Sequence, residues 1–520
     1  MKKPDLINRL ITMAVAALLV SCGKSVEPPE PVIVPTEKPV VAPIPLSVTT
    51  FSFTAAANPK LSADVNCRIF GDSITAFIPE LQTDVTLIPT FSGEFDKAEV
   101  NGVIQTPGLS QQDFSRTVVY RFYKGNDVLT FRVYVSTFTG LPIVTIQTVN
   151  MQPVLDRENW VEGDISIQPT PTSAGFEGAM KMRGRGNATW FYEKKPYRFK
   201  FESKTPILGM PSDKEWVLLA DYCDKSLLRT SYGFVLSRLA GLPWTPRGQH
   251  VELFMNGAYQ GTYYLCEHVK AATNRANIAA NGFLIERDNY WNLEPLWFGT
   301  VRNNHYTFRY PDPDDINADH PYYKFARDFV NSFETALYSD DFKDPETGYA
   351  RYIDVQNFAQ WFLIQEMLGN IDTNPYMALE SREGKLKMYP VWDFEWSLGL
   401  AAPGNNGWAM PPATSPVAMA YWKNNVYYDR LFSDPAFVDI VREEWQKFKY
   451  AHLTQLLAEI DAIVEKIKLS QAENFRRWPI LGQYVSVNLV AFPTWKEEVN
   501  YARHFLLQRV EWLDSEIKKW

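Results

Sequence analysis

The sequence GFEGAMKMRGRGNATWFYEKKPYRFKF, from Gly175 to Phe201, predicts a β-strand, a glycine-rich turn and a second β-strand. In the run YRFKF that ends it, aromatic residues alternate with Arg and Lys. A period of two residues is typical of a strand that buries one face and exposes the other. We therefore expect a hairpin with an apolar face and a basic face.

C-terminal to this hairpin, helical patterns mix with strand patterns. Asn256-Gly257 predicts a type I′ turn in a second hairpin, His250 to Lys270. One helix is expected to begin at Asp224 or Ser226 and to end at Gly241. The predicted helices are Ser226–Leu242, Pro321–Leu337, Val355–Leu368 and most of Pro435–Trp520, interrupted around Pro479 and Pro493. The order of elements predicts an α+β protein in which a strand-rich part precedes a helix-rich part.

Residues 47–140 have a different character, because short alternating runs such as TVVYRFYKG and LTFRVYVSTF are separated by turn residues. Strands at this spacing are typical of a small antiparallel sandwich of immunoglobulin-like type. The region has no concentrated polar chemistry, so a spacer or interaction module is expected. The pattern changes after Leu141, which predicts a second domain over residues 141–520.

The N-terminus has the features of a lipoprotein signal. Basic residues precede the apolar run ITMAVAALLV, and Leu19-Val20-Ser21 stands directly before Cys22. The run is shorter than the roughly 20 residues that a membrane-spanning helix needs, and it fits a signal peptide over residues 1–22. The Cys resembles the lipobox of bacterial lipoproteins, in which it becomes the lipidated first residue. We expect a lipid-anchored protein of the bacterial cell envelope, with the inner or outer membrane undecided.

Residues 23–46 are rich in Pro, which predicts an extended linker between the anchor and the folded part. The chain has 52 basic and 60 acidic residues and a net charge of −8, which argues against a nucleic-acid partner. Cys67, Cys223 and Cys266 form no CxxC pair, and no two histidines have ligand spacing, so structural zinc is not expected. One disulfide stays open as an alternative to buried free cysteines.

Two acidic segments lie close together in the C-terminal half. GNIDTNPYM contains Asp372, and YPVWDFEWSLG contains Asp393 and Glu395; a predicted turn and short strand separate them. Carboxylates among large aromatic residues predict an interior polar site, because a carboxylate that leaves water needs a partner or a metal. The alternative is that Asp372 caps a turn and that the other two share a solvated strand face.

The turn Gly184-Arg185-Gly186-Asn187 is followed by Lys194, Lys195, Arg198 and Lys200. Cations near one turn, with carboxylates on a distant segment, are what phosphoryl transfer requires. The motif matches neither the GxGxxG nor the Walker pattern, so a solvated basic strand face is the alternative.

Several segments resemble the CotH-type atypical kinases, the family named for spore-coat protein H. The segments appear in family order from about Leu141 to the C-terminus: the RGN turn with KKPYRFKF, DKEWVLLADYCDKSLLRTSYG, NGAYQGTYYLCEHV, GFLIERD, YTFRYPD, NIDTNPYM and PVWDFEWSLG. The resemblance implies a divergent kinase-like fold with a strand-rich lobe over a helical lobe. It also implies ATP, Mg²⁺ or Mn²⁺, and an exported protein as the substrate.

The resemblance also implies roles for individual residues. Asp372 matches the catalytic acidic position, and Asp393 matches the metal-binding position of a WDxD-like motif. Asn374 and Glu395 are the further candidate metal ligands. The candidate nucleotide contacts are Arg185, Asn187, Lys195 and Lys200, with Glu267 as the partner that positions one of these cations.

One departure from the family pattern concerns Glu395, which stands where the family has Asp. It leaves a shifted metal site or a pseudokinase as alternatives. A surface lipoprotein that binds glycan or peptide without catalysis is the main rival function. Glycoside hydrolysis by two carboxylates is a formal third.

Overall fold

The computed structural model describes residues 45–520 except 79–80, 82–83, 169–172, 174 and 402–420. Residues 46–520 form one compact unit. The predicted signal peptide, Cys22 and nearly all of the linker lie outside the described residues. The compact unit is a mixed α+β structure, as predicted. None of its described helices combines the length and hydropathy needed to cross a membrane.

Residues 47–137 form β-sheets around a hydrophobic core of their own, which includes Phe53, Tyr120, Phe122 and Val133. One sheet has the order β2-β1-β6 and another β3-β4-β11-β10-β7-β8, in which β4 and β11 pair in parallel. The immunoglobulin-like class stays a prediction. The strands are β1 Ser47–Phe53, β2 Val65–Asn66, β3 Arg68–Phe70, β4 Ser73–Ile78, β5 Thr86–Leu87, β6 Thr90–Glu94, β7 Lys97–Val100, β8 Val103–Ile104, β9 Gln112–Asp113, β10 Val118–Lys124 and β11 Asp127–Thr137.

The separate core leads to a prediction about residues 47–137. Their deletion should leave the remainder folded and able to bind ATP with its original affinity, because the core residues of the remainder come from residues 141–520. Thr139 should be kept, since its hydroxyl donates to the buried Glu252. Circular dichroism and ATP binding would check the shortened chain. A folded product that no longer binds ATP would contradict the predicted two-domain division.

The next seven strands close into a barrel in the order β12-β13-β14-β15-β16-β18-β17. Parallel pairing of β12 with β17 closes it, a feature that the sequence patterns do not reveal. The predicted hairpin is confirmed as β14 and β15, with Phe199 fully buried inside the barrel. Asn256 and Gly257 both have positive φ, as a type I′ turn requires. The strands are β12 Ile143–Thr148, β13 Val161–Ile167, β14 Phe176–Gly184, β15 Tyr197–Ile207, β16 Met210–Leu219, β17 Gly248–Met255 and β18 Ala258–Glu267.

A further sheet has the order β20-β21-β19-β22-β23. Its strands are β19 Phe283–Arg287, β20 Trp297–Gly299, β21 His305–Tyr310, β22 Tyr376–Leu379 and β23 Leu386–Met388. The α-helices are α1 Arg229–Leu239, α2 Pro321–Leu337, α3 Val355–Leu368, α4 Tyr428–Leu431, α5 Pro435–Lys447, α6 Leu453–Ile467, α7 Ser470–Arg477 and α8 Trp495–Ile517. Short helical turns are η1 Val149–Met151, η2 Ala188–Phe191, η3 Trp291–Leu293, η4 Tyr349–Arg351, η5 Trp422–Asn424 and η6 Phe448–His452.

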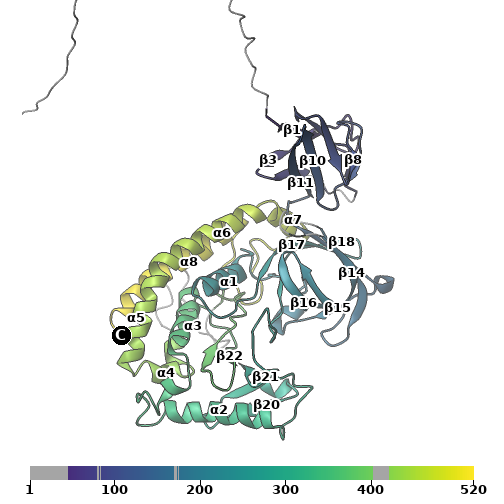
Figure 1. Cartoon of the computed structure of the whole chain (residues 1–520). Coiled ribbons are helices and arrows are strands. Elements are labelled where there is room, and N and C mark those ends of the chain that lie inside the picture. The colour runs from purple at the N-terminus through teal and green to yellow at the C-terminus, as the bar shows by residue number, and fades with distance from the viewer. Residues whose placement is uncertain (1–44, 79–80, 82–83, 169–172, 174, 402–420) are drawn as a thin grey trace, which may run out of the picture. The chain divides into compact units, whose positions relative to one another are not determined.

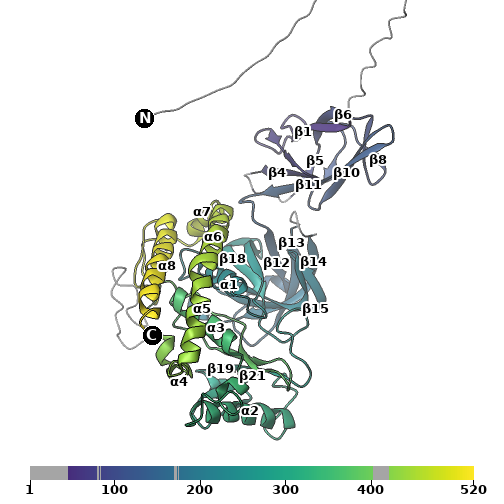
Figure 2. The ribbon, with the colours of Figure 1, turned by 60° about the vertical axis from the view of Figure 1, so that its left-hand side comes forward.

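Helix α3 is almost entirely buried and contacts α1, α5 and α8 (Figure 1). Arg509 of α8 forms a buried ion pair with Glu366 of α3 at 2.5 Å, which compensates both charges for the loss of water. Helices α6 and α8 lie side by side (Figure 2), joined by the Arg503–Asp461 ion pair. The C-terminal helices thus fix α3, which leads the chain into the acidic segments.

Candidate active site

Asp372 and Asp393 come together because of the β22–β23 hairpin. Asp372 precedes β22 and Asp393 follows β23, and antiparallel pairing of Met377 with Met388 puts these two ends at the same place. Hydrogen bonds join the segments directly. Thr373 Oγ1 donates to Trp392 O at 3.0 Å, and Asn370 Nδ2 donates to Asp393 O at 3.2 Å. The two acidic segments are therefore neighbours in the structure. Asp372 and Asp393 are both solvent-exposed, so the interior site expected from the sequence is wrong for this pair, because the segments meet at the surface.

Asp393 has a left-handed backbone, with φ of 64°. Asp is one of the few residue types besides Gly that adopt this conformation readily. Although Asp393 is solvent-exposed, the packed surroundings of its carboxyl and the neighbouring Asp372 raise the pKa of that group to about 7, while Arg185 acts in the opposite direction. A nearby cation would lower this pKa again, because a cation stabilises the charged form of a carboxyl group.

Arg185 reaches this pair of carboxylates from the barrel. It lies in the turn between β14 and β15, and its guanidinium lies 5.5 Å from the centre of the Trp392 ring. The turn is compact, because Gly186 has φ of 81° and a Cβ on Gly184 would collide with the Trp190 ring. The glycine-rich turn thus brings one cation next to Asp393.

The other residues predicted to contact the nucleotide interact with protein groups other than Asp393. Lys195 donates to Trp190 O at 2.7 Å, and Lys200 lies 4.2 Å from the Trp160 ring centre. Asn187 accepts a hydrogen bond of 2.9 Å from Arg157. Glu267 is buried and pairs with Arg247 at 2.7 Å rather than with Arg185, Lys195 or Lys200. Strand alternation explains Lys200, since its side chain points away from the barrel core that Phe199 fills.

Glu395 is held by Cys223, whose amide and thiol both donate to Oε1, at 3.4 and 3.1 Å. Burial is the main cause of its raised pKa. Asn374 is half-buried in the loop between Asp372 and β22. All three cysteines after Cys22 are free, and Cys223 and Cys266 are buried.

Among the described residues, no group of three or more His, Cys, Asp and Glu side chains is arranged to hold a metal ion alone. Mg²⁺ in nucleotide sites is commonly held by one or two carboxylates together with phosphate oxygens. The neighbouring Asp372 and Asp393, with the raised pKa of Asp393, fit that mode of binding. Asp372 and Asp393 are therefore the candidate carboxylates for that mode of binding.

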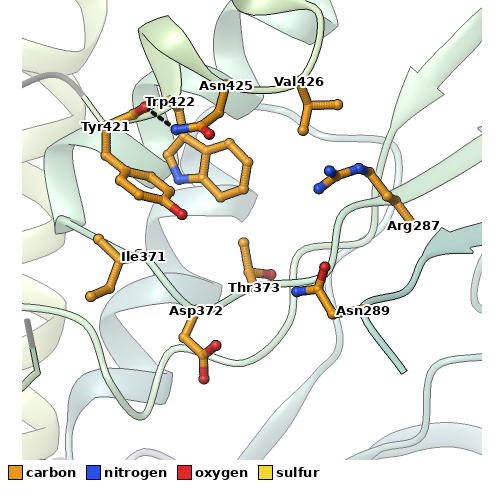
Figure 3. Close-up of a pocket in the computed structure, with 9 residues that line it drawn as sticks. All are labelled: Arg287, Asn289, Ile371, Asp372, Thr373, Tyr421, Trp422, Asn425 and Val426. Atoms are coloured by element: carbon orange, nitrogen blue, oxygen red, sulfur yellow. Dashed lines mark hydrogen bonds between the residues drawn. The ribbon is translucent and has the colours of Figure 1, made fainter. Parts of the chain in front are cut away.

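A pocket with a volume of about 190 Å³ lies beside Asp372 (Figure 3). Trp422 forms part of its wall and is fixed there because its indole Nε1 donates to Asn370 O at 2.7 Å. Figure 3 shows the Arg287 guanidinium and the Tyr421 hydroxyl directed into the pocket from opposite sides. Asp372 is exposed at the edge of this pocket, and the protein atoms packed around its carboxyl raise its pKa. Polar residues that line the pocket are Arg287, Asn289, Asp372, Thr373, Tyr421 and Asn425.

Sequence reasoning did not predict this pocket, and it named Lys194 only as one of the cations after the glycine-rich turn. Of the neighbours Lys194 and Lys195, Lys194 is the buried one: it donates to Thr262 O at 2.5 Å and to Asn474 Oδ1 at 2.9 Å. Burial lowers the pKa of Lys194 to about 8, and Asp221 and Glu395 lie near enough to oppose that shift. In the sequence, Lys194 and Lys195 are equivalent neighbours, so only the fold separates them.

Helix α1 packs its backbone against the Asp393 segment, which leads to a prediction. A Cβ on Gly233 would stand 2.1 Å from the Phe394 ring, next to Asp393. Gly233→Ala should therefore displace Asp393 or destabilise the fold by about 1–3 kcal/mol. Thermal unfolding and ATP binding would check it. Gly299→Ala is the control, because its Cβ would meet His305 at an ordinary 3.6 Å. Equal behaviour of the two variants would contradict the tight packing.

The assembled site agrees with the match to a known family: residues 182–513 match the family described as CotH kinase protein. The chain belongs to the CotH kinase family. The resemblance inferred from the motifs is thereby confirmed. Membership points to a kinase-like function, and kinases in general use ATP and a divalent metal.

Other comparisons add little. No curated protein matches the sequence. The crystal structure of the Golgi casein kinase aligns with 72% of this chain and 74% of its own, at 9% identity and a TM-score of 0.23. At that TM-score the likeness carries no argument about this chain.

Proposed function

We propose that this chain is an exported, membrane-anchored kinase that transfers the γ-phosphate of ATP to hydroxyl groups of a protein substrate. The observation that carries the proposal is the pairing of Asp372 with Asp393 on adjacent loops, with Arg185 beside them, in a member of the CotH kinase family. The barrel then serves as the strand-rich lobe and the helices around α3 as the second lobe.

The two carboxylates take different parts in this proposal. Asp393, next to the barrel cation Arg185, would hold Mg²⁺ or Mn²⁺ together with the ATP phosphates, with Asn374 as a further ligand. The metal, when bound, supplies positive charge that neutralises the triphosphate. Asp372, at the edge of the polar pocket, orients the acceptor hydroxyl and accepts its proton. Arg185 adds a second positive charge at the phosphates.

Glu395 receives a supporting role in the proposal. Its two contacts with Cys223 favour a function in holding the Asp393 segment against the loop before α1. Asp224 caps that helix, accepting from the amides of Leu228 and Arg229, and Arg229 Nε donates to Ser397 O at 2.8 Å. The segment that carries Asp393 is thus anchored by contacts that need no metal.

The second candidate is a silent, pseudokinase-like surface lipoprotein that binds peptide or glycan. The engagement of Glu395 by Cys223 favours it, because this carboxylate is then less available as a ligand. Incubation of the purified protein with ATP and Mg²⁺ or Mn²⁺, followed by mass spectrometry of phosphorylated Ser, Thr and Tyr, separates the two. Incorporated phosphate supports the kinase, whereas nucleotide binding without transfer supports the silent protein.

The proposed location depends on Cys22, which leads to a prediction. Cys22→Ala should move the protein from the membrane fraction to the soluble fraction, because the lipid would no longer be attached. Fractionation of cells that express each form would check it. Cys67→Ala is the matched control, since Cys67 lies in the folded part and should leave the protein at the membrane. An unchanged distribution of the Cys22 variant would argue against the lipid anchor.

A further inference from the structure

The pocket beside Asp372 is small and polar. Its volume of about 190 Å³ is below the roughly 300–1,000 Å³ of sites that enclose drug-sized ligands. A volume of this size suits one or two side chains of a peptide better than a whole nucleoside triphosphate. Its place beside Asp372 suits the acceptor rather than the nucleotide.

Arg287 is the cation of this pocket. Its amide donates to Pro375 O at 2.8 Å, which ties the end of β19 to the loop that carries Asp372. Its Nε donates to Asn304 Oδ1 at 3.1 Å, and Asn304 in turn donates to Glu334 at 2.8 Å. These bonds hold the guanidinium so that its terminal nitrogens face the pocket, as Figure 3 shows.

Within the described part of the chain, no carboxylate lies within ion-pair distance of Arg287. Its neighbours on β19 and just beyond, Glu286 and Asp288, lie within 4 Å of Arg309 instead. Residues 402–420, which precede Tyr421, include no Asp or Glu that could supply one. A fixed guanidinium directed into a polar pocket is best satisfied by an anionic oxygen group, since such bonds are roughly twice as strong as neutral ones.

We propose that Arg287 binds an anionic group of the acceptor, close to the hydroxyl that Asp372 orients. The inference rests on the proposed function and names its substrate class: hydroxyl residues with a carboxylate or phosphate group near them in the sequence. The amides of Asn289 and Asn425 line the same pocket and offer hydrogen bonds to a peptide.

The test uses labelled seven-residue peptides with one Ser and, at each flanking position in turn, Glu, phosphoserine or Gln. Binding to the full chain is measured by fluorescence anisotropy without ATP. At the favoured position, a Glu or phosphoserine peptide should bind about tenfold more tightly than its Gln counterpart. The better of the two identifies the source of the anion. Arg287→Gln should remove the preference, and Arg302→Gln, an exposed cation on the loop between β20 and β21, should retain it.

Each outcome has a defined meaning. Equal binding of Gln and anionic peptides by the unaltered protein overturns the inference. It is also overturned if Arg287→Gln raises the KM for ATP and leaves the peptide preference intact, because the guanidinium then serves the nucleotide. A preference that depends on Arg287 without any phosphate transfer supports the anion site and contradicts the kinase function.

Discussion

Asp372→Asn should bind ATP as the unaltered protein does, yet transfer phosphate about 10²–10⁴-fold more slowly. The exchange keeps the size of the side chain and removes the group that accepts the hydroxyl proton. Asp372 lies at the edge of a pocket on the acceptor side, so the loss should appear in kcat and not in nucleotide affinity. Phosphate incorporation, followed by mass spectrometry over time, measures the rate.

Asp315→Asn is the control for this change, since Asp315 is an exposed carboxylate on the loop before α2. It should leave the rate unaltered. If Asp372→Asn transfers phosphate at the original rate, Asp372 is not the group that acts on the hydroxyl, and the division of roles is wrong.

Asp393→Asn should weaken metal-dependent ATP binding by at least about 10–100-fold, the loss typical for changes around a bound metal. Asn is the informative substitution because it also tolerates the positive φ at this position. The backbone then stays in place and only the charge is lost. Anisotropy of labelled ATP, titrated with Mg²⁺ present and with chelator, measures the effect.

The same titration has an internal check. In chelator, both forms should bind ATP weakly, and Asp393→Asn should bind no more weakly than the unaltered protein, because the carboxylate attracts the phosphates only through the metal. If Asp393→Asn keeps its metal-dependent affinity, the metal is held elsewhere and Asp393 has a structural role.

Local patterns predicted much of the fold. Helices α2 and α3 have the predicted bounds, because Pro321 at the first turn, Asp354 as a cap and Gly369 after the last turn mark their ends. Helix α1 is shorter than the predicted Ser226–Leu242. Asp224 accepts amide bonds from Leu228 and Arg229 before the first helical residue, Arg229, and Gly241, with φ of 79°, follows the last helical residue, Leu239. Barrel closure by parallel pairing of β12 and β17 could not be predicted, because it joins strands about 100 residues apart.

For the candidate site too, features set by local sequence could be predicted, whereas features set by tertiary contacts could not. The short strand between the acidic segments was visible in the sequence, and a hairpin there is enough to bring Asp372 and Asp393 together. The partners of Glu267 and the burial of Lys194 depend on tertiary contacts, with Arg247 in one case and Asn474 in the other. Arg287 lies in GFLIERD, one of the segments that carry the family resemblance, but the sequence assigned it no role, since a single Arg at the end of a strand resembles any solvated cation.

The central claim is that this protein binds ATP through a divalent metal held at Asp393, and titration calorimetry of the unaltered protein tests it most directly. ATP should produce a saturable binding isotherm in the presence of Mg²⁺ or Mn²⁺, and the isotherm should largely disappear in chelator. If no nucleotide binding is detected with any divalent metal, the kinase account is contradicted and a surface-binding lipoprotein takes its place.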